Sequence, residues 1–397
     1  MNRVKKGLDT LRISVKKDTF LQGFQKIKKL DKTTLIKMIA LLILILVGVY
    51  WQGKFGIVRV LGSGLFDKNN QRLRISHQDY PPKIGSFTKT NEEFSHSLRD
   101  YYVKTAYNCC ASGEFNNDWV SLEALEHCIK QGARCLDFQI FSLDNSPVIA
   151  VSDDKDYSVK GSYNSIPFAE AMKKVNDYAF SASKTQCAGD PLLLHFRIMT
   201  NNISIMDTMA DNIENILGNR RLDGYSYEHE GKNIGREPLA SFKDKNGGKV
   251  IIIVDKSYTN PRNKTHLHEF VNITSNSAFM RTLRDFDVKT GDMQELMNYN
   301  KKNMTMCIPD IDGKHKNPNP VYAHGVGCQF VAMTFQNMND SRMNYYTDFF
   351  NKEGTAFVLK PAQLRHKPNL IPAPKEAPKE HSYADRKIEA DFYSFTY

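Results

Sequence analysis

Two apolar segments of this sequence each carry a pair of polar side chains that could do chemistry together. Asp137 and Gln139 lie two residues apart in one segment, and His195 and Arg197 lie two residues apart in the other. Residues two apart in a β-strand point to the same face, so each pair shares a face. Arg197 could form an ion pair with Asp137, or it could hold a phosphate group directly. We favour the ion pair because buried charges are normally paired, and we interpret His195 as a core histidine rather than a catalyst.

The segments around these pairs alternate between strand-like and helix-like patterns. Strand patterns cover 101–106, 135–141, 192–198, 249–254, 329–335 and 357–359, and helical spacing covers 122–129, 168–179 and 206–216. The β-branched run at 249–254 is typical of a strand that is buried on both faces of a parallel sheet. Such alternation favours a parallel (β/α)8 barrel, although periodicity alone does not exclude an open doubly wound sheet.

Two strings near the C-terminal end are more specific. Residues 327–336 read GCQFVAMTFQ, and residues 357–365 read FVLKPAQLR. Together they resemble the closing part of the catalytic barrel of phosphoinositide-specific phospholipase C. Fainter similarity is found at 98–108, 132–139, 147–151 and 191–197. The resemblance runs from about residue 95 to 365, and it implies a TIM-type (β/α)8 barrel with an N-terminal half at 95–245 and a C-terminal half at 246–365.

In that family two histidines transfer protons, and a calcium ion bound to Asn, Glu, Asp and Glu stabilises the phosphoryl charge. The resemblance places Tyr107 and Val151 at the two histidine positions. The residues at the four calcium positions are Asn108, Asp137, Gln139 and Arg197. A tyrosine with a pKa of about 10 is a poor base at neutral pH, valine carries no proton, and arginine repels a dication. The resemblance therefore implies that catalysis is lost, and we expect neither calcium nor another cofactor.

The family's groups that bind inositol phosphates are also replaced. Its two lysines after the fifth strand fall near Ile253 and Asp255, so that only Lys256 is close by. The arginine and tyrosine of its inositol-binding string become Met306 and Ile308. The expected ligand-binding residues are therefore Asn108, Asp137, Gln139, Arg197 and Lys256.

Positive charge is concentrated at the N-terminus of the chain. The net charge is +10, and residues 1–37 contain eleven Lys or Arg and three Asp, which leaves +8 in this segment and only +2 in the rest. A basic arm at 1–33 beside a nearly neutral body argues against nucleic-acid binding and favours contact between the arm and anionic lipid. Apolar residues alternate with lysines in the arm, which fits an amphipathic membrane-surface helix or a simple solvated arm.

An uncharged apolar run follows the arm. Residues 38–51 read MIALLILILVGVYW, and with Leu35 and Ile36 they approach the roughly 20 residues that a membrane-spanning helix needs. We predict a single transmembrane helix at 34–52, because a cleaved signal peptide has a shorter leader and a buried core helix is rarely apolar on all faces. The positive-inside rule then places the N-terminus in the cytoplasm and the barrel on the lumenal or extracellular side. Five N-glycosylation sequons fit that side; they begin at Asn202, Asn263, Asn272, Asn303 and Asn339.

The remaining segments carry less information. Residues 53–94 are predicted to form a connecting stalk. Residues 366–397 form a Pro/Lys/Glu-rich tail that we expect to be flexible, with an aromatic end that either docks elsewhere or frays. The seven cysteines have no metal-site spacing, and we expect buried thiols at Cys128, Cys135 and Cys328.

Three functions stay open at this point. We favour a membrane-anchored, catalytically inactive barrel that binds an anionic lipid headgroup or a protein partner as a scaffold. The second hypothesis is a divergent, metal-independent phosphodiesterase that acts on a phosphoinositide or a related phosphodiester and uses Arg197, His195, Asp137 and Tyr107. The third is a structural membrane protein whose barrel is only a stable body.

Overall fold

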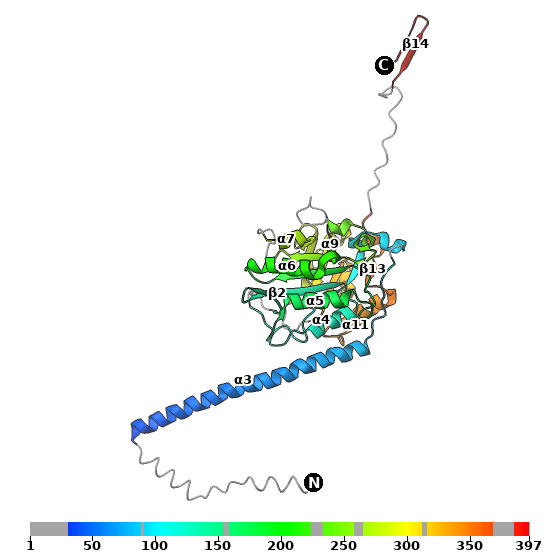
Figure 1. Ribbon diagram of the computed structural model, residues 1–397. Helices are drawn as coiled ribbons and strands as arrows, with labels where there is room; N and C mark the ends of the chain where they lie inside the picture. Colours follow the sequence, from blue (N-terminus) through cyan, green and yellow to red (C-terminus); the bar gives the residue numbers. More distant parts are fainter. Residues whose placement is uncertain are drawn as a thin grey trace.

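The folded body is an α/β barrel, with a long helix on its N-terminal side and a small hairpin on its C-terminal side (Figure 1). The computed structural model describes residues 31–88, 91–153, 159–223, 233–257, 265–311, 316–367 and 385–396. Within the first range the backbone is described throughout, whereas the side chains of residues 32, 35, 38, 48–63 and 77 are not.

Eight parallel strands form the barrel. In spatial order they are β10 (Met280–Arg284), β11 (Met304–Ile308), β12 (Phe330–Met333), β1 (Tyr101–Ala106), β2 (Cys135–Leu143), β5 (Leu192–Ile198), β8 (Val250–Asp255) and β9 (Ile273–Ser275). Each neighbouring pair in this order is parallel. The barrel is nearly closed, because the two ends of the order, β9 and β10, lie beside each other.

Shorter strands extend this sheet or stand apart from it. Strand β3 (Ser146–Ala150) pairs antiparallel with β2, and β4 (Ile166–Pro167) pairs with β3. Strand β13 (Phe357–Leu359) pairs antiparallel with the first half of β1. Two separate ribbons are formed by β6 (Lys243–Asp244) with β7 (Gly247–Gly248) and by β14 (Lys387–Ala390) with β15 (Tyr393–Thr396).

The helices that connect the strands lie on the outside of the barrel (Figure 1). They are α4 (Leu122–Lys130), α5 (Phe168–Ala179), α6 (Ser204–Leu217), α7 (Leu267–Phe270), α8 (Asp285–Thr290), α9 (Met293–Lys302), α10 (Pro320–Gly325) and α11 (Ser341–Glu353). Short 3-10 turns are η2 (Glu92–Ser95), η3 (Leu98–Asp100), η4 (Gly218–Arg220), η5 (Ile234–Arg236), η6 (Leu239–Phe242) and η7 (Ala362–Leu364). Each longer helix buries one apolar stripe: in α5, Phe168, Met172 and Val175 are buried against the sheet.

The sequence patterns predicted the main elements and the barrel. The strands at β1, β2, β5, β8, β12 and β13 and the helices α4, α5 and α6 are confirmed. The patterns missed β9, β10 and β11, which have three to five residues each. Strands this short carry too few alternations for a periodic signal, and polar residues of β10 lie half-buried. Strands β12 and β13 are equally short, but they lie in the two specific strings at 327–336 and 357–365.

The long helix α3 (Lys32–Asp79) docks its C-terminal part along α4. Asn69 donates to Asp118 Oδ1 at 3.0 Å, and Arg74 pairs with Glu123. Gln131, just past the end of α4, donates to the Tyr80 carbonyl at 2.9 Å. In these three contacts the residue numbers increase in the same direction in both segments, so α3 runs parallel to α4. Since α4 begins where β1 ends, the N-terminal part of α3 leaves the body at the carboxyl end of the barrel strands.

The N-terminal half of α3 covers the segment that was predicted to cross a membrane. In the part of the chain that the structure describes, no helix is long and apolar enough to do so. Apolar side chains from Ile36 to Val47 are exposed where they are described. The side chains at 48–51 and the basic arm at 1–30 lie outside the described residues.

The sequons differ in accessibility. Asn272 is only 3% exposed, and its Nδ2, the atom that would carry a glycan, donates to the Leu222 carbonyl at 3.0 Å. Glycosylation at Asn272 is therefore incompatible with the folded barrel. Asn339 is exposed, and Asn202 and Asn303 are partly exposed. Asn263 lies outside the described residues.

All seven cysteines are buried and none is disulfide-bonded. Cys135 and Cys328 are fully buried and Cys128 is 3% exposed, as small apolar residues in a core would be. Their positions in or beside the strand and helix core confirm the expectation of buried thiols.

Lys104 places an amine inside the packed wall of the barrel. Among the described residues its Nζ has no hydrogen-bond partner, and the ring centre of Phe350 lies 5.9 Å away. Burial lowers the pKa of Lys104 to about 8 from the ordinary 10.5. Between these values the unfolded chain binds more protons than the folded one. The charged amine therefore destabilises the fold below pH 8, and the penalty shrinks as the pH rises toward 10.5.

Replacing Lys104 with methionine should stabilise the protein in a pH-dependent way. The pKa difference corresponds to about 3 kcal/mol at neutral pH, so Lys104→Met should raise the Tm by on the order of 5 °C at pH 7 and by less at pH 9.5. Thermal melts followed by circular dichroism at both pH values measure this. The matched control is Lys352→Met on the exposed side of α11, which should show no pH-dependent difference from the wild type. A gain for Lys104→Met that is equal at both pH values would contradict charge burial as the cause.

Candidate functional site

The polar residues singled out from the sequence meet at the carboxyl ends of β1, β2 and β5. Asp137 lies in β2, His195 and Arg197 lie in β5, and Tyr107 and Asn108 follow β1 directly. In the parallel register of β2 and β5, Asp137 is opposite His195. The alternation of side chains along both strands turns these groups to one side of the sheet, where they contact each other.

The Arg197 guanidinium is the centre of this cluster. Its Nε donates to Asp137 Oδ1 at 2.9 Å, and its Nη2 donates to Asp137 Oδ2 at 2.6 Å. Nη2 also donates to Asn108 Oδ1 at 2.6 Å, and Nη1 donates to Tyr107 Oη at 3.3 Å. The guanidinium carbon lies 4.6 Å from the centre of the Tyr107 ring, a cation–π arrangement. The two-pronged ion pair with Asp137 confirms the pairing that we favoured from the sequence.

The Asp137 carboxylate is fully buried, and both of its oxygens accept hydrogen bonds. Besides Arg197, the backbone N–H of Asn108 donates to Oδ2 at 3.0 Å, and His195 Nδ1 lies 2.7 Å from Oδ1. Asn108 adopts a positive φ of 43°, a conformation that asparagine tolerates better than most residues. Burial favours a raised pKa for Asp137, but the Arg197 charge and the His195 hydrogen bond outweigh it and lower the pKa below its usual value. The carboxylate therefore stays ionised inside the barrel.

His195 links Asp137 to a residue that the sequence analysis missed. Its Nε2 lies 2.9 Å from Ser275 Oγ, so serine, histidine and aspartate form a chain in the order of a hydrolase triad. All three side chains are fully buried, so the serine is not in contact with solvent in this structure. The negative charge of Asp137 is balanced by the Arg197 guanidinium. Ser275 ends the three-residue strand β9, which lacks a periodic signal, so nothing local in the sequence pointed to it.

Three other predicted residues lie outside this network. Gln139 forms a reciprocal pair with the backbone of Ser152, donating from Nε2 at 3.1 Å and accepting at Oε1 at 2.8 Å. Val151 is buried, and its carbonyl accepts from the N–H of Gly161 at 2.8 Å. Lys256 follows β8, and its backbone N–H donates to the Ser275 carbonyl at 3.1 Å. The structure therefore brings five of the eight predicted residues into one cluster.

A cover formed by residues 112–120, the loop between β1 and α4, closes the cluster. Phe115 packs edge-on against the Tyr107 ring, with 5.4 Å between ring centres. Gln336 Nε2 donates to the Gly113 carbonyl at 3.0 Å, and Asp118 is bound by Asn69 of α3. Tyr107 is 5% exposed and Arg197 is 1% exposed. The cover thus separates the guanidinium from solvent and ties the loop to α3.

The residues present do not fit a calcium ion. Calcium requires six to eight oxygen ligands. Both Asp137 oxygens and Asn108 Oδ1 instead accept hydrogen bonds from the cation Arg197, which would repel a second cation. Within the described ranges, no group of three or more His, Cys, Asp or Glu residues is arranged to hold a metal.

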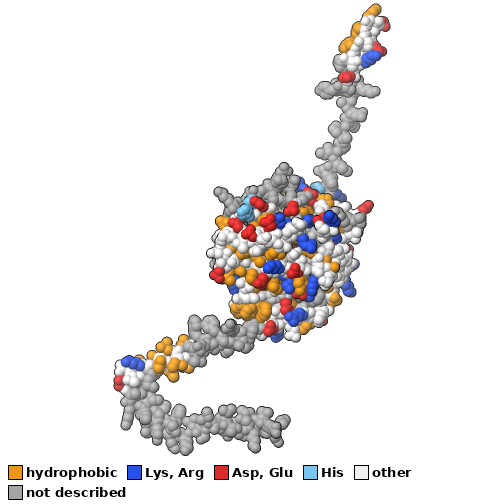
Figure 2. Space-filling model, in the orientation of Figure 1, with side chains coloured by type: hydrophobic (Ala, Val, Ile, Leu, Met, Phe, Trp, Pro, Cys, Tyr) orange, Lys and Arg blue, Asp and Glu red, His pale blue; other side chains and the backbone are white. Residues whose placement is uncertain are grey.

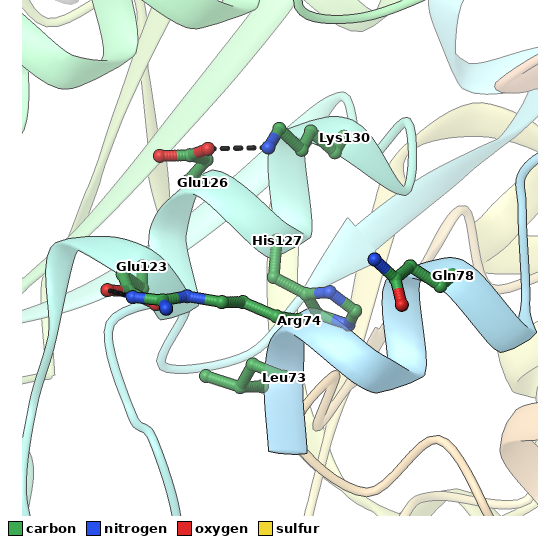
Figure 3. Close-up of a pocket in the computed structure, with 7 residues that line it drawn as sticks. All are labelled: Leu73, Arg74, Gln78, Glu123, Glu126, His127 and Lys130. Atoms are coloured by element: carbon green, nitrogen blue, oxygen red, sulfur yellow. Dashed lines mark hydrogen bonds and ion pairs between the residues drawn. The ribbon is translucent and has the colours of Figure 1, made fainter. Parts of the chain in front are cut away.

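A cavity of about 370 Å³ lies elsewhere, between α3 and α4 (Figure 3). It is lined by Leu73, Arg74, Gln78, Glu123, Glu126, His127 and Lys130. Its charges are matched internally, since Arg74 pairs with Glu123, and Lys130 pairs with Glu126 at 2.5 Å. The cavity is thus distinct from the Arg197 cluster and belongs to the docking contact of α3.

Comparison with known proteins identifies both halves of the barrel. The model of the phosphatidylinositol-specific phospholipase C X domain matches residues 94–256, and the model of the Y domain matches residues 250–363. Among solved structures, PLC21 of L. pealei is similar with 17% identity and a TM-score of 0.54, and PLC21 of S. officinalis with 16% identity and a TM-score of 0.53. Each match covers 68% of this chain and 38% of the solved chain, and at this identity the likeness shows the fold alone. No curated protein sequence matches this chain.

Removing the guanidinium should destabilise the barrel. Arg197→Met leaves the buried Asp137 carboxylate without its main counter-charge, a change that typically costs about 3–5 kcal/mol. We expect a Tm lower by on the order of 5–10 °C in thermal melts. The control is Arg74→Met, which breaks an ion pair whose arginine is 69% exposed and should cost at most about 1 kcal/mol.

A second substitution tests the cause of this loss. Asp137→Asn in the Arg197→Met background removes the unpaired charge and should recover part of the lost stability, which a double-mutant cycle measures. An Arg197→Met variant as stable as the wild type would contradict the ion pair as the support of the site.

Proposed function

Since the two matches together span more than half of it, the chain belongs to the phosphatidylinositol-specific phospholipase C family, and we propose that it is a catalytically inactive member. In this proposal the barrel is held at a membrane and serves as a binding or scaffold module for an anionic lipid headgroup or a protein partner. The match spans only 38% of the length of these solved structures, so the proposal rests on the residues of this chain.

The observation that carries the proposal is the place of Arg197. By the family resemblance this position holds the last calcium-binding glutamate, and here a cation side chain occupies it. The guanidinium uses both oxygens of Asp137 and the Asn108 side-chain oxygen. A second cation at the same point would face repulsion at short range in a buried setting. The charge that would stabilise a phosphoryl transition state is therefore already neutralised by Asp137.

Proton transfer is not supported either. Tyr107, at the first histidine position, accepts a hydrogen bond from Arg197 and lies under Phe115. Val151, at the second position, has no ionisable group. His195 is fully buried between Asp137 and Ser275. General acid–base catalysis typically contributes about 10²–10⁴-fold for each group, and both groups have been replaced.

A divergent, metal-independent phosphodiesterase is the second candidate, and one observation favours it. Tyr107, Asp137, His195 and Arg197 do form one hydrogen-bonded cluster, as that hypothesis requires. A buried guanidinium could bind a phosphodiester directly if the cover opened. The near-complete burial of all four side chains weighs against this candidate.

Membrane attachment is proposed from helix α3 and the basic arm. The described apolar side chains of α3 between Ile36 and Val47 are about half exposed or more, which is unfavourable in water. Eleven basic residues precede or flank this run and would contact anionic lipid. If the apolar run at 34–52 crosses the membrane, the positive-inside rule places the N-terminus in the cytoplasm and the barrel on the lumenal or extracellular side. The third hypothesis, a structural membrane protein, applies if the barrel binds no ligand or partner and serves only as a stable body.

Activity is tested by the release of phosphorylated headgroup. The purified full chain is incubated with vesicles of phosphatidylinositol or its 4,5-bisphosphate, with and without calcium. We expect no turnover above the protein-free control, because both proton-transfer groups and the metal ligands are replaced. The variants Arg197→Ala and Asp137→Asn should release no more headgroup than the wild type, whatever their effect on stability. Turnover that either substitution abolishes would instead establish the divergent phosphodiesterase.

Topology is tested by glycan mapping after expression in eukaryotic cells. A lumenal barrel should carry a glycan at Asn339, which is exposed, and none at Asn272, whose amide is hydrogen-bonded inside the barrel. Peptide mass spectrometry with and without glycosidase reads each site separately, and Asn339→Gln is the matching control. An unmodified Asn339 in a membrane-bound chain, together with a barrel that cytoplasmic protease digests, would place the barrel on the other side.

A further inference from the structure

Basic side chains gather at the amino end of the barrel, opposite the Arg197 cluster. Four segments that are distant in sequence meet there: η3, η5, the last turn of α9 and the residues that follow η7. Since η3 precedes β1 and α9 precedes β11, these segments lie where barrel strands begin. We name this group the amino-end patch, and its members are Arg99, Arg236, Lys302 and His366.

Hydrogen bonds and packing hold the patch together. Arg99 Nη1 donates to the Lys302 carbonyl at 2.8 Å, and the backbone N–H of His366 donates to Asp100 Oδ1 at 3.3 Å. Turn η5, which carries Arg236, packs against η3, which carries Arg99. The four basic side chains are thus brought together by the fold, because they come from four separate stretches of the sequence.

The guanidinium of Arg99 is buried without a full set of partners. Arg99 is 7% exposed, and its Nε has no hydrogen-bond partner among the residues that the structure describes. Nη1 is bound to the Lys302 carbonyl, which leaves the opposite side of the guanidinium available. That side, formed by Nε and Nη2, is an edge that can bind two oxygens of an oxyanion at once. Since a buried donor without a partner is unfavourable, an oxygen ligand at this edge would stabilise it.

Positive charge in the patch exceeds the negative charge beside it. Arg236 and Lys302 are exposed, and within the described residues neither takes part in an ion pair. Glu237 follows Arg236 in the chain but is not paired with it. Burial lowers the pKa of His366, and the charges of the other three members lower it further, against the opposing charge of Asp100. Three permanent cations beside one carboxylate attract an anion.

We propose that the amino-end patch binds a soluble phosphate compound that carries two or more negative charges, such as a pyrophosphate or a phosphate monoester. A carboxylate has two oxygens and one charge, so the edge of Arg99 alone would satisfy it. A phosphate group has three or more acceptor oxygens and about two charges at neutral pH, which matches that edge together with the exposed cations Arg236 and Lys302. The patch and the Arg197 cluster lie at opposite ends of the barrel, so the proposal does not depend on whether the barrel is active.

The patch faces away from the apolar part of α3. The N-terminal part of α3 leaves the body at the carboxyl end of the strands, whereas the patch lies at the amino end. Figure 2 shows the exposed apolar side chains of α3 at the lower left, and Figure 1 shows α9 on the upper side of the body. A headgroup in a membrane that contacts this part of α3 is therefore out of reach of the patch, which favours a soluble ligand.

Isothermal titration calorimetry of the detergent-solubilised full chain with sodium pyrophosphate, in magnesium-free buffer, tests this proposal. We expect saturable binding to the wild type with a Kd of about 100 µM or below. Lys302→Glu should weaken binding at least about tenfold, because it reverses a charge of the patch. The matched control is Lys352→Glu, which makes the same change in the last turn of α11, outside the patch, and should alter the Kd by less than about threefold. Circular dichroism melts without ligand should show that both variants are folded.

A second arm separates a soluble ligand from a lipid headgroup. Co-sedimentation with vesicles of phosphatidylcholine and phosphatidic acid should be equal for the wild type and Lys302→Glu, because the patch faces away from the membrane. Vesicle binding that Lys302→Glu weakens, in a protein that does not bind pyrophosphate, would make a lipid headgroup the ligand instead.

Three results of the calorimetry would also overturn the proposal. They are the absence of binding up to about 5 mM pyrophosphate, equal weakening by Lys302→Glu and Lys352→Glu, and tighter binding of a polyglutamate peptide than of pyrophosphate. The last result would identify an acidic protein segment as the ligand of the patch.

Discussion

The ion pair between Arg197 and Asp137 is the interaction on which the carboxyl end of the barrel depends. A fully buried carboxylate is tolerated only when a counter-charge and hydrogen bonds replace its hydration, and Arg197 supplies both from the neighbouring strand. The remaining bonds follow from that pair. Asn108 satisfies both partners through its backbone N–H and its side-chain oxygen, Tyr107 lies under the guanidinium, and His195 continues the network to Ser275. The centre that the family resemblance associates with a metal is thus filled by the protein's own cation.

Segments outside the barrel wall help to keep this centre dry. Phe115 covers Tyr107 from the loop after β1, and that loop is bound by Gln336 on one side and by Asn69 of α3 on another. Exclusion of water strengthens each electrostatic contact beneath the cover. Helix α3 therefore contributes to the polar centre as well as extending from the body, because its docked part fixes the loop that carries Phe115.

The barrel and the polar centre inside it are formed by different side chains of this chain. Eight parallel strands and their outer helices maintain the barrel of the phosphatidylinositol-specific phospholipase C family, while the polar groups inside it form a closed network. A shared fold does not carry a shared activity, since activity resides in particular side chains and their exposure.

The sequence by itself determined the barrel, because the strings at 327–336 and 357–365 and the long apolar strands β1, β2, β5 and β8 are strong local signals. The sequence also determined which residue types stand where the resemblance places the family's proton-transfer and metal-binding residues, such as Val151, since identity does not depend on packing. Whether Arg197 pairs with Asp137 or stays open to a phosphate was decided only by the tertiary structure, through the register of β2 against β5 and the cover by Phe115. Short strands such as β9, and with them Ser275, also needed the fold. A strand of three residues has no periodicity of its own and is held by pairing with a neighbour distant in sequence.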